Sequence, residues 1–211
     1  TGVDFVSPIS FDREVSSLSA EQFTGILVEV LNMSGLVVGP DFRMGKNRDA
    51  DVSKLAEIGI DQGFNIQVVE QQKSNDLPVR STAIRNLLSQ GDVGSVSEML
   101  GRYFSTTGEV IHGLKRGRDL GFPTCNLIPT EGMAIPKDGI YATLVYIGNR
   151  QYMAATSIGT RPTFDEGGRT IESYVLDFDQ EVYGETIKLE FVKHIRDEKA
   201  FDTIKNLIIQ M

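Results

Sequence analysis

The first hundred residues alternate short apolar runs with segments in which apolar residues recur at helical spacing. A helix is expected over residues 19–32, where Ser19 and Gln22 stand at the spacing of a capping box. The other expected helices are residues 49–62, 81–90 and 93–100, and the expected strands are residues 3–9, 36–39 and 64–70. Strands and helices in alternation predict an α/β part with a parallel sheet and crossover helices.

The second half of the chain changes to the period of strands. Ile187, Leu189 and Phe191 alternate with Lys188 and Glu190, which is typical of a half-buried strand. Strands are expected over residues 106–111, 140–147, 151–157, 170–178 and 186–193. Strands at this spacing predict an all-β antiparallel barrel. An apolar stripe predicts a closing helix over residues 198–210. The change from helical to strand periodicity places the domain boundary near residue 101, which gives domains 1–101 and 102–211.

Composition narrows the class of protein. The 211 residues carry a net charge of −8, which argues against general nucleic-acid binding. The single cysteine, Cys125, excludes an internal disulfide and cysteine-based zinc sites. No apolar run approaches membrane-spanning length and no signal peptide is recognisable, so a cytoplasmic protein without a membrane partner is expected. The chain begins at Thr1 and enters an apolar run almost at once, which predicts a piece of a longer protein.

The most informative segment is residues 108–127, GEVIHGLKRGRDLGFPTCNL. Glycines allow close approach of backbone N–H groups, which form concavities that bind anions, and the cations add charge for phosphate. The alternative is that these glycines mark tight turns in a small barrel. The candidate nucleotide-binding residues are Gly108, Gly113, Lys115, Gly117, Arg118, Gly121, Thr124 and Asn126.

Two further residue types suggest the chemistry. Thr124 and Asn126 share a face of an extended segment, and Mg²⁺ commonly binds few protein oxygens together with substrate phosphates. These residues are therefore the candidate metal ligands. Glu172 would lie beside ring-bearing side chains on a strand and is the candidate general base. An ordinary solvent-facing glutamate remains the alternative.

Two weaker motifs complete the candidates. Arg161 stands before Pro162 in SIGTRPTF (residues 157–164) and could face phosphate, or the segment could be a plain hairpin connection. Ser81 and Thr82 begin an expected helix, whose N-terminus suits phosphate, with Arg85 one turn later. Simple N-capping is the alternative there.

Together these residues resemble the bacterial bifunctional riboflavin kinase/FMN adenylyltransferases, also called FAD synthetases. The family pattern G-R-x-L-G-[FI]-P-T-A-N stands here as residues 117–126, GRDLGFPTCN. Matching segments follow in the family order at residues 139–142, 158–164, 172, 176–178, 183–184 and 196–198. In the first half, VVGPDFRMG (residues 37–45) resembles the adenylyltransferase part, whereas residues 79–85 match its S-S-T-R-I-R signature poorly.

The resemblance implies a fold and an activity. The fold would be an incomplete Rossmann-like nucleotidyltransferase part followed by a six-stranded barrel with a C-terminal helix. The barrel would phosphorylate riboflavin to FMN with ATP and Mg²⁺, with Glu172 as base and Thr124 and Asn126 at the metal. Arg161, Arg196 and Glu198 would help to bind flavin. The implied partners are small molecules only; a homo-oligomer is left open.

The chain also departs from the family pattern. Cys125 replaces the usual Ala, and Ser173-Tyr174 replaces the usual Thr-His after the base. The family motif G-x-F-D-G-x-H-x-G-H, whose histidines bind the triphosphate, is absent. These 211 residues are therefore expected to make FMN but not FAD, whereas a full-length protein would do both. A non-catalytic flavin- or nucleotide-binding regulatory barrel is the alternative function.

Overall fold

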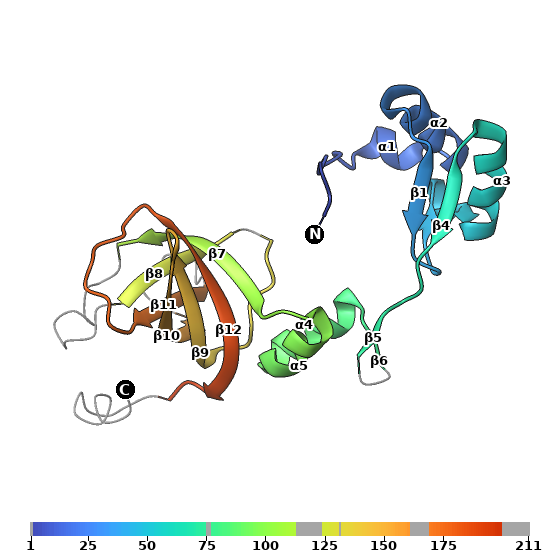
Figure 1. Ribbon diagram of the computed structural model, residues 1–211. Coiled ribbons are helices and arrows are strands. Elements are labelled where there is room, and N and C mark those ends of the chain that lie inside the picture. Colours follow the sequence, from blue (N-terminus) through green and yellow to red (C-terminus); the bar gives the residue numbers. More distant parts are fainter. Residues whose placement is uncertain (1, 75–76, 113–123, 131, 161–168, 200–211) are drawn as a thin grey trace. The chain divides into compact units, whose positions relative to one another are not determined.

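The computed structural model describes residues 2–74, 77–112, 124–130, 132–160 and 169–199. The chain divides into two compact units, Thr1–Gln72 and Lys73–Met211 (Figure 1). This division lies before residue 101 because helices α4 (Ser81–Gln90) and α5 (Val93–Leu100) contribute side chains to the core of the second unit. The domain boundary near residue 101 itself stays a prediction.

The first unit is built on a short parallel βαβ motif, as expected. Strand β1 (Gly35–Val38) pairs in parallel with β4 (Asn65–Val68), and α3 (Val52–Gln62) forms the crossover. Before it lies α2 (Ala20–Leu31), and its capping box is confirmed. The hydroxyl of Ser19 accepts from the Gln22 backbone N–H at 3.2 Å, and Gln22 Oε1 accepts from the Ser19 backbone N–H at 2.9 Å.

The core of the first unit is small. It consists of side chains from α2, α3 and their flanks, namely Ala20, Ala50, Leu55, Ile58 and Phe64. Gly59 on α3 allows Phe64 to fold back against the helix, because a Cβ there would lie 2.6 Å from the Phe64 carbonyl oxygen. The remaining elements are α1 (Arg13–Ser17), the 3₁₀ turn η1 (Lys46–Arg48), and the pair β2 (Arg43–Met44) and β3 (Ala50–Asp51).

The strand expected over residues 3–9 is wrong. These residues form no strand, and the side chains of Phe5 and Val6 are 90% and 88% exposed. An apolar run becomes a strand only where a neighbouring backbone accepts its hydrogen bonds, and no pattern within the run supplies that neighbour.

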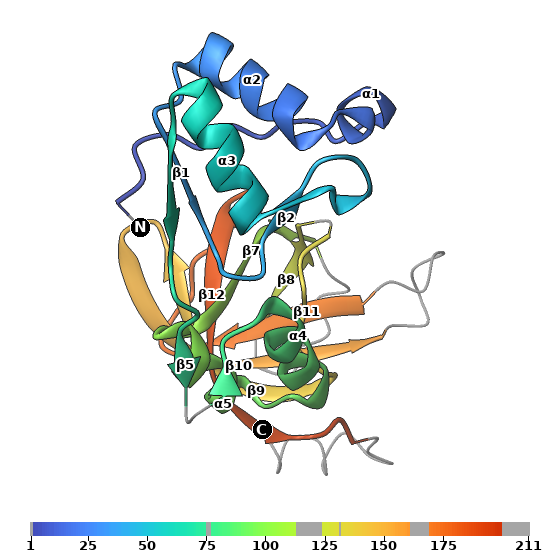
Figure 2. The same cartoon turned by 90° about the vertical axis from the view of Figure 1, so that its right-hand side faces the viewer.

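The second unit contains a closed six-stranded antiparallel barrel, as expected. The strands are β7 (Phe104–Ile111), β8 (Thr124–Pro129), β9 (Gly139–Ile147), β10 (Arg150–Thr160), β11 (Arg169–Val175) and β12 (Thr186–Arg196). Their order around the barrel is β10-β11-β8-β7-β12-β9. Figure 2 labels these strands from a second direction. A short pair, β5 (Lys73–Ser74) and β6 (Leu77–Pro78), precedes α4. Strand β11 ends at Val175, before the expected residue 178, because Asp177 takes a left-handed conformation with φ 54°.

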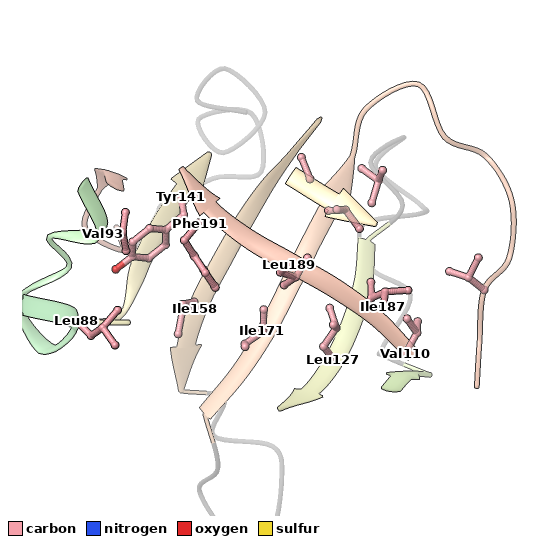
Figure 3. Packing of buried hydrophobic residues seen from close by; sticks show 14 of the residues in the cluster. Leu88, Val93, Val110, Leu127, Tyr141, Ile158, Ile171, Ile187, Leu189 and Phe191 are labelled. Carbon is pink, nitrogen blue, oxygen red and sulfur yellow. The ribbon is translucent and has the colours of Figure 1, made fainter. Parts of the chain in front are cut away.

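The barrel interior is a mainly apolar core that α4 and α5 close at one end. Figure 3 shows Ile158, Ile171, Leu127 and Leu189 pointing into this interior. Leu88 of α4 and Val93 of α5 belong to the same cluster, and the Leu88 carbonyl accepts from the Lys137 backbone N–H at 2.8 Å. No described helix is long and apolar enough to cross a membrane. The closing helix expected at residues 198–210 lies almost wholly outside the described residues.

Candidate active site

The register of β8 and β11 brings two of the predicted site residues together. Asn126 and Glu172 are direct cross-strand partners, and Thr124 pairs with Tyr174. Directly paired residues share a face of the sheet, with Cβ atoms about 4.5–5.5 Å apart. Their neighbours Leu127 and Ile171, which also pair, are buried in the barrel core. Asn126 and Glu172 therefore lie on the outer wall, where both are half-buried.

The row of paired residues continues across four strands. Ser157 of β10 pairs with Glu172 on the side away from Asn126, and Ile111 of β7 pairs with Asn126. The carboxylate of Glu172 thus has a hydroxyl residue on one neighbouring strand and an amide residue on the other. The sequence analysis placed Ser157 only at the start of a loop motif, since its position in this row depends on pairing.

The chemistry of this row fits Mg²⁺ only together with an anionic ligand. Thr124 and Asn126 offer neutral oxygens, and Glu172 offers one carboxylate. Among the described residues there is no group of three or more His, Cys, Asp or Glu that could hold a metal. A hard dication bound here would need oxygens from a phosphate-bearing substrate, which is the usual situation for Mg²⁺ at nucleotides.

Glu198 lies against the same wall of the barrel. A Cβ on Gly159 would stand 2.0 Å from Glu198 Oε1, so the carboxylate lies directly over this glycine and a side chain there would displace it. Gly159 follows Ser157 by two residues on β10 and pairs with Thr170 of β11. Partial burial, and then the nearby Asp138 carboxylate, raise the pKa of Glu198. The Arg196 guanidinium donates to the Asp197 carbonyl at 3.2 Å.

Two features of the site were not found from the sequence. Arg169 begins β11 and donates to Asp138 and to the Pro136 carbonyl, which ties this strand to the segment before β9. Thr143, Thr156 and Ser173 are hydroxyl residues buried inside the barrel. In the sequence they are recognisable only as polar residues at the inward positions of alternating strands.

Cys125 packs against the core, and burial raises the pKa of its thiol, which agrees with a structural role.

The remaining candidates lie elsewhere or outside the described residues. Gly108 is buried in β7, where a Cβ would stand 2.5 Å from the Ile128 carbonyl oxygen, so close strand packing requires this glycine. Ser81, Thr82 and Arg85 are exposed on α4, whose N-cap is Arg80 without a side-chain cap hydrogen bond. Their contacts to nucleotide stay predictions. Outside the described residues lie Gly113, Lys115, Gly117, Arg118, Gly121 and Arg161.

Comparison with known proteins covers both units. A family model for riboflavin kinase matches residues 100–211, and a family model for FAD synthetase matches residues 1–83. The bifunctional riboflavin kinase/FMN adenylyltransferase of Listeria monocytogenes is 34% identical over 211 residues, covering 100% of this chain and 67% of that protein. The protein of the same name from Bacillus subtilis is 35% identical over 213 residues, again covering 100% and 67%.

A solved structure is similar along most of the chain. The crystal structure titled macrolide-efflux protein from Streptococcus pneumoniae is 30% identical, with a TM-score of 0.85, covering 95% of this chain and 65% of that one. The chain thus spans about two thirds of the length of its relatives. The named relatives support an enzyme and give no support to the non-catalytic alternative. From its barrel, its site residues and these matches, the chain belongs to the family of bifunctional riboflavin kinase/FMN adenylyltransferases.

Proposed function

We propose that the barrel transfers the γ-phosphate of ATP to the 5′-hydroxyl of riboflavin, with Glu172 as general base. The observation that carries this proposal is the direct pairing of Glu172 with Asn126 on one wall of the barrel. A base in phosphoryl transfer must lie close to the groups that position the phosphates, because positioning and charge neutralisation supply most of the catalysis. The pairing supplies that proximity from two rigid strands.

In the reaction, the Glu172 carboxylate accepts the proton of the 5′-hydroxyl as its oxygen bonds to the γ-phosphorus. The bond between the γ-phosphorus and the bridging oxygen breaks, and ADP leaves with that oxygen. Thr124 and Asn126 would hold Mg²⁺ with the nucleotide phosphates, and the ion would supply neutralisation of phosphate charge. Ser157 lies on the far side of Glu172, so the carboxylate sits within a polar row rather than in bulk water.

The other predicted contacts belong to the same proposal. Gly108, the cations and glycines between residues 113 and 121, and the start of α4 would contact nucleotide. Arg161, Arg196 and Glu198 would contact flavin, and support for Glu198 comes from its position over Gly159 on the outer wall. Because the 211 residues lack the histidine motif of FMN adenylylation, they would produce FMN and no FAD.

The experiment is chromatography of the purified chain incubated with riboflavin, ATP and Mg²⁺. We expect FMN from the natural sequence, and turnover about a thousandfold lower from Glu172→Gln, with riboflavin affinity retained. Glu109→Gln is the matched control, since Glu109 is an exposed strand glutamate on β7. Full turnover by Glu172→Gln would remove this residue from the base role. No FMN from the natural sequence would reject the proposed kinase and favour a flavin-binding barrel.

A further inference from the structure

Three hydroxyl side chains form a chain of contacts through the barrel interior. Thr143 Oγ1 lies 2.7 Å from Thr156 Oγ1, and Thr156 Oγ1 lies 2.8 Å from Ser173 Oγ. Thr143 also donates to the Ala154 carbonyl at 3.3 Å. The three residues are 2%, 0% and 0% exposed. We call them the hydroxyl ladder, and it joins the neighbouring strands β9, β10 and β11.

The ladder ends directly behind the proposed base. Ser173 follows Glu172 on β11, so the two side chains leave the strand on opposite faces, one into the core and one onto the outer wall. Both residues pair with neighbouring residues of β10, because Thr156 pairs with Ser173 and Ser157 pairs with Glu172. The hydroxyl contact inside the barrel and the polar row outside it therefore come from two successive residue pairs of β10 and β11.

The ladder distinguishes registers that the apolar core does not. A shift of β11 by one residue would bring Glu172 into the core, and the apolar pattern forbids it. A shift by two residues would keep Ile171, Val175 and their apolar neighbours inside. It would, however, separate Ser173 from Thr156 and leave the buried Ser173 hydroxyl without this partner, which costs free energy. The same shift would move Glu172 away from Asn126.

We infer that Thr156 and Ser173 are positioning residues, which hold Glu172 opposite Asn126 through the hydroxyl contact inside the barrel. The inference rests on the proposed role of Glu172 as base. It assigns to two buried residues an effect on turnover that does not require either to touch substrate. Thr106 is a suitable contrast, because it is equally buried in the same barrel, on β7, and its hydroxyl meets the sulfur of Met133 at 3.9 Å.

The test is steady-state kinetics of paired variants of the 211-residue chain, with melting temperatures measured alongside. Ser173→Ala and Thr156→Val remove a ladder hydroxyl, and each should lower kcat about tenfold with both KM values changed less than about twofold. Ser173→Thr and Thr156→Ser keep the hydroxyl and should keep kcat. The control Thr106→Val should also keep kcat.

The Thr156 pair separates positioning from stability. Valine keeps the methyl group and the shape of threonine, whereas serine loses that methyl group from the core, so Thr156→Ser should melt lower while retaining kcat. If kcat instead follows melting temperature across all five variants, the ladder is structural only and the inference is overturned. If one variant fails to fold, the test uses the remaining variants and compares those that keep a ladder hydroxyl with those that lack it.

A double-mutant cycle tests whether the ladder acts through Glu172. In the Glu172→Gln background, Ser173→Ala should leave the residual turnover unchanged, because the group that it positions is already gone. An equal tenfold loss in both backgrounds would show an independent effect and overturn the inference. The proposed function is tested separately. Normal turnover by Glu172→Gln would reject the base role of Glu172. Lost turnover by Glu172→Gln together with normal kcat in Ser173→Ala would reject only the positioning role of the hydroxyl ladder.

Discussion

The two units of this chain bury their apolar residues to very different degrees. In the barrel each strand pairs on both sides, and inward residues such as Leu189 and Phe191 are completely buried. In the first unit each described sheet has only two strands, and the side chains of Val37 on β1 and Ile60 on α3 are 63% and 83% exposed. Closure of a sheet gives every inward side chain neighbours on all sides, whereas a two-stranded sheet leaves edges and faces uncovered.

Buried hydroxyls show the same contrast. In the first unit Thr24 is fully buried, but it donates to the Ala20 carbonyl at 2.9 Å within its own helix and to Gln62 Oε1 at 2.8 Å. In the barrel the hydroxyl ladder joins three strands. The Thr24 contacts stabilise its own helix and join α2 to α3, whereas contacts between paired strands also constrain how the strands are aligned. This makes the barrel the better support for a site that depends on register.

The largest expected effect comes from removing a core ring in each unit. Phe191→Ala should lower the free energy of unfolding of the barrel by about 3–5 kcal/mol and abolish kinase activity. Phe64→Ala should damage the first unit and leave barrel unfolding nearly unchanged. All six tyrosines follow residue 72 and the chain has no tryptophan, so tyrosine fluorescence during urea unfolding reports on the second unit. Equal loss of barrel stability in both variants would break the contrast.

A smaller effect is expected for the proposed metal ligand on the barrel wall. Thr124→Ala should raise the KM for the Mg²⁺–ATP complex about tenfold, because one polar contact is lost. Thr24→Val, a hydroxyl deletion in the first unit, should leave that KM unchanged. The measurement is initial rate against ATP at saturating riboflavin. An unaltered ATP dependence for Thr124→Ala would count against its ligand role.

The smallest effect concerns the buried phenol at the closed end of the barrel. Tyr141 donates to the Lys137 carbonyl at 2.6 Å, and burial raises its pKa from 10.0 to about 12. Because the folded barrel keeps this proton longer than the unfolded chain, the stabilisation is complete below pH 10 and is lost as the pH rises towards 12.

Tyr141→Phe should therefore cost the barrel about 1 kcal/mol at neutral pH and weaken the fall in stability above pH 10. Urea midpoints measured from pH 8 to 11.5 by circular dichroism would show this change of slope. Part of the pH dependence of stability should remain in this variant, because the hydrogen bond to Glu190 also raises the pKa of Tyr146. An unchanged slope would contradict the assignment to Tyr141.

Elements with a complete local signal were predicted well. Helix α4 occupies residues 81–90, as expected. Helix α2 begins at Ala20, directly after the N-cap Ser19 of the expected capping box. The apolar pattern did not predict strand β8, because its sequence TCNLIP contains polar residues and a proline. It forms because β7 and β11 lie on either side of it and accept its pairing.

The candidate site divides in the same way. The identities of Thr124, Asn126 and Glu172 were available from motif and resemblance, since these depend on residue type and order. Their arrangement was not available, because it depends on which residue of β11 pairs with which residue of β8. Ser157, Arg169 and the hydroxyl ladder entered only with the contacts that β9, β10 and β11 make in the folded barrel.

The sequence by itself determined helices α2 to α5, most of the strands, the two-part organisation and the residue types of the candidate phosphoryl-transfer site. Caps and alternating periods act over a few neighbouring residues, so they are readable along the chain. Only the tertiary structure decided that Asn126 and Glu172 face each other, that Ser173 lies behind the proposed base and that residues 3–9 form no strand. These facts depend on contacts between distant segments, whose register is set when the barrel closes.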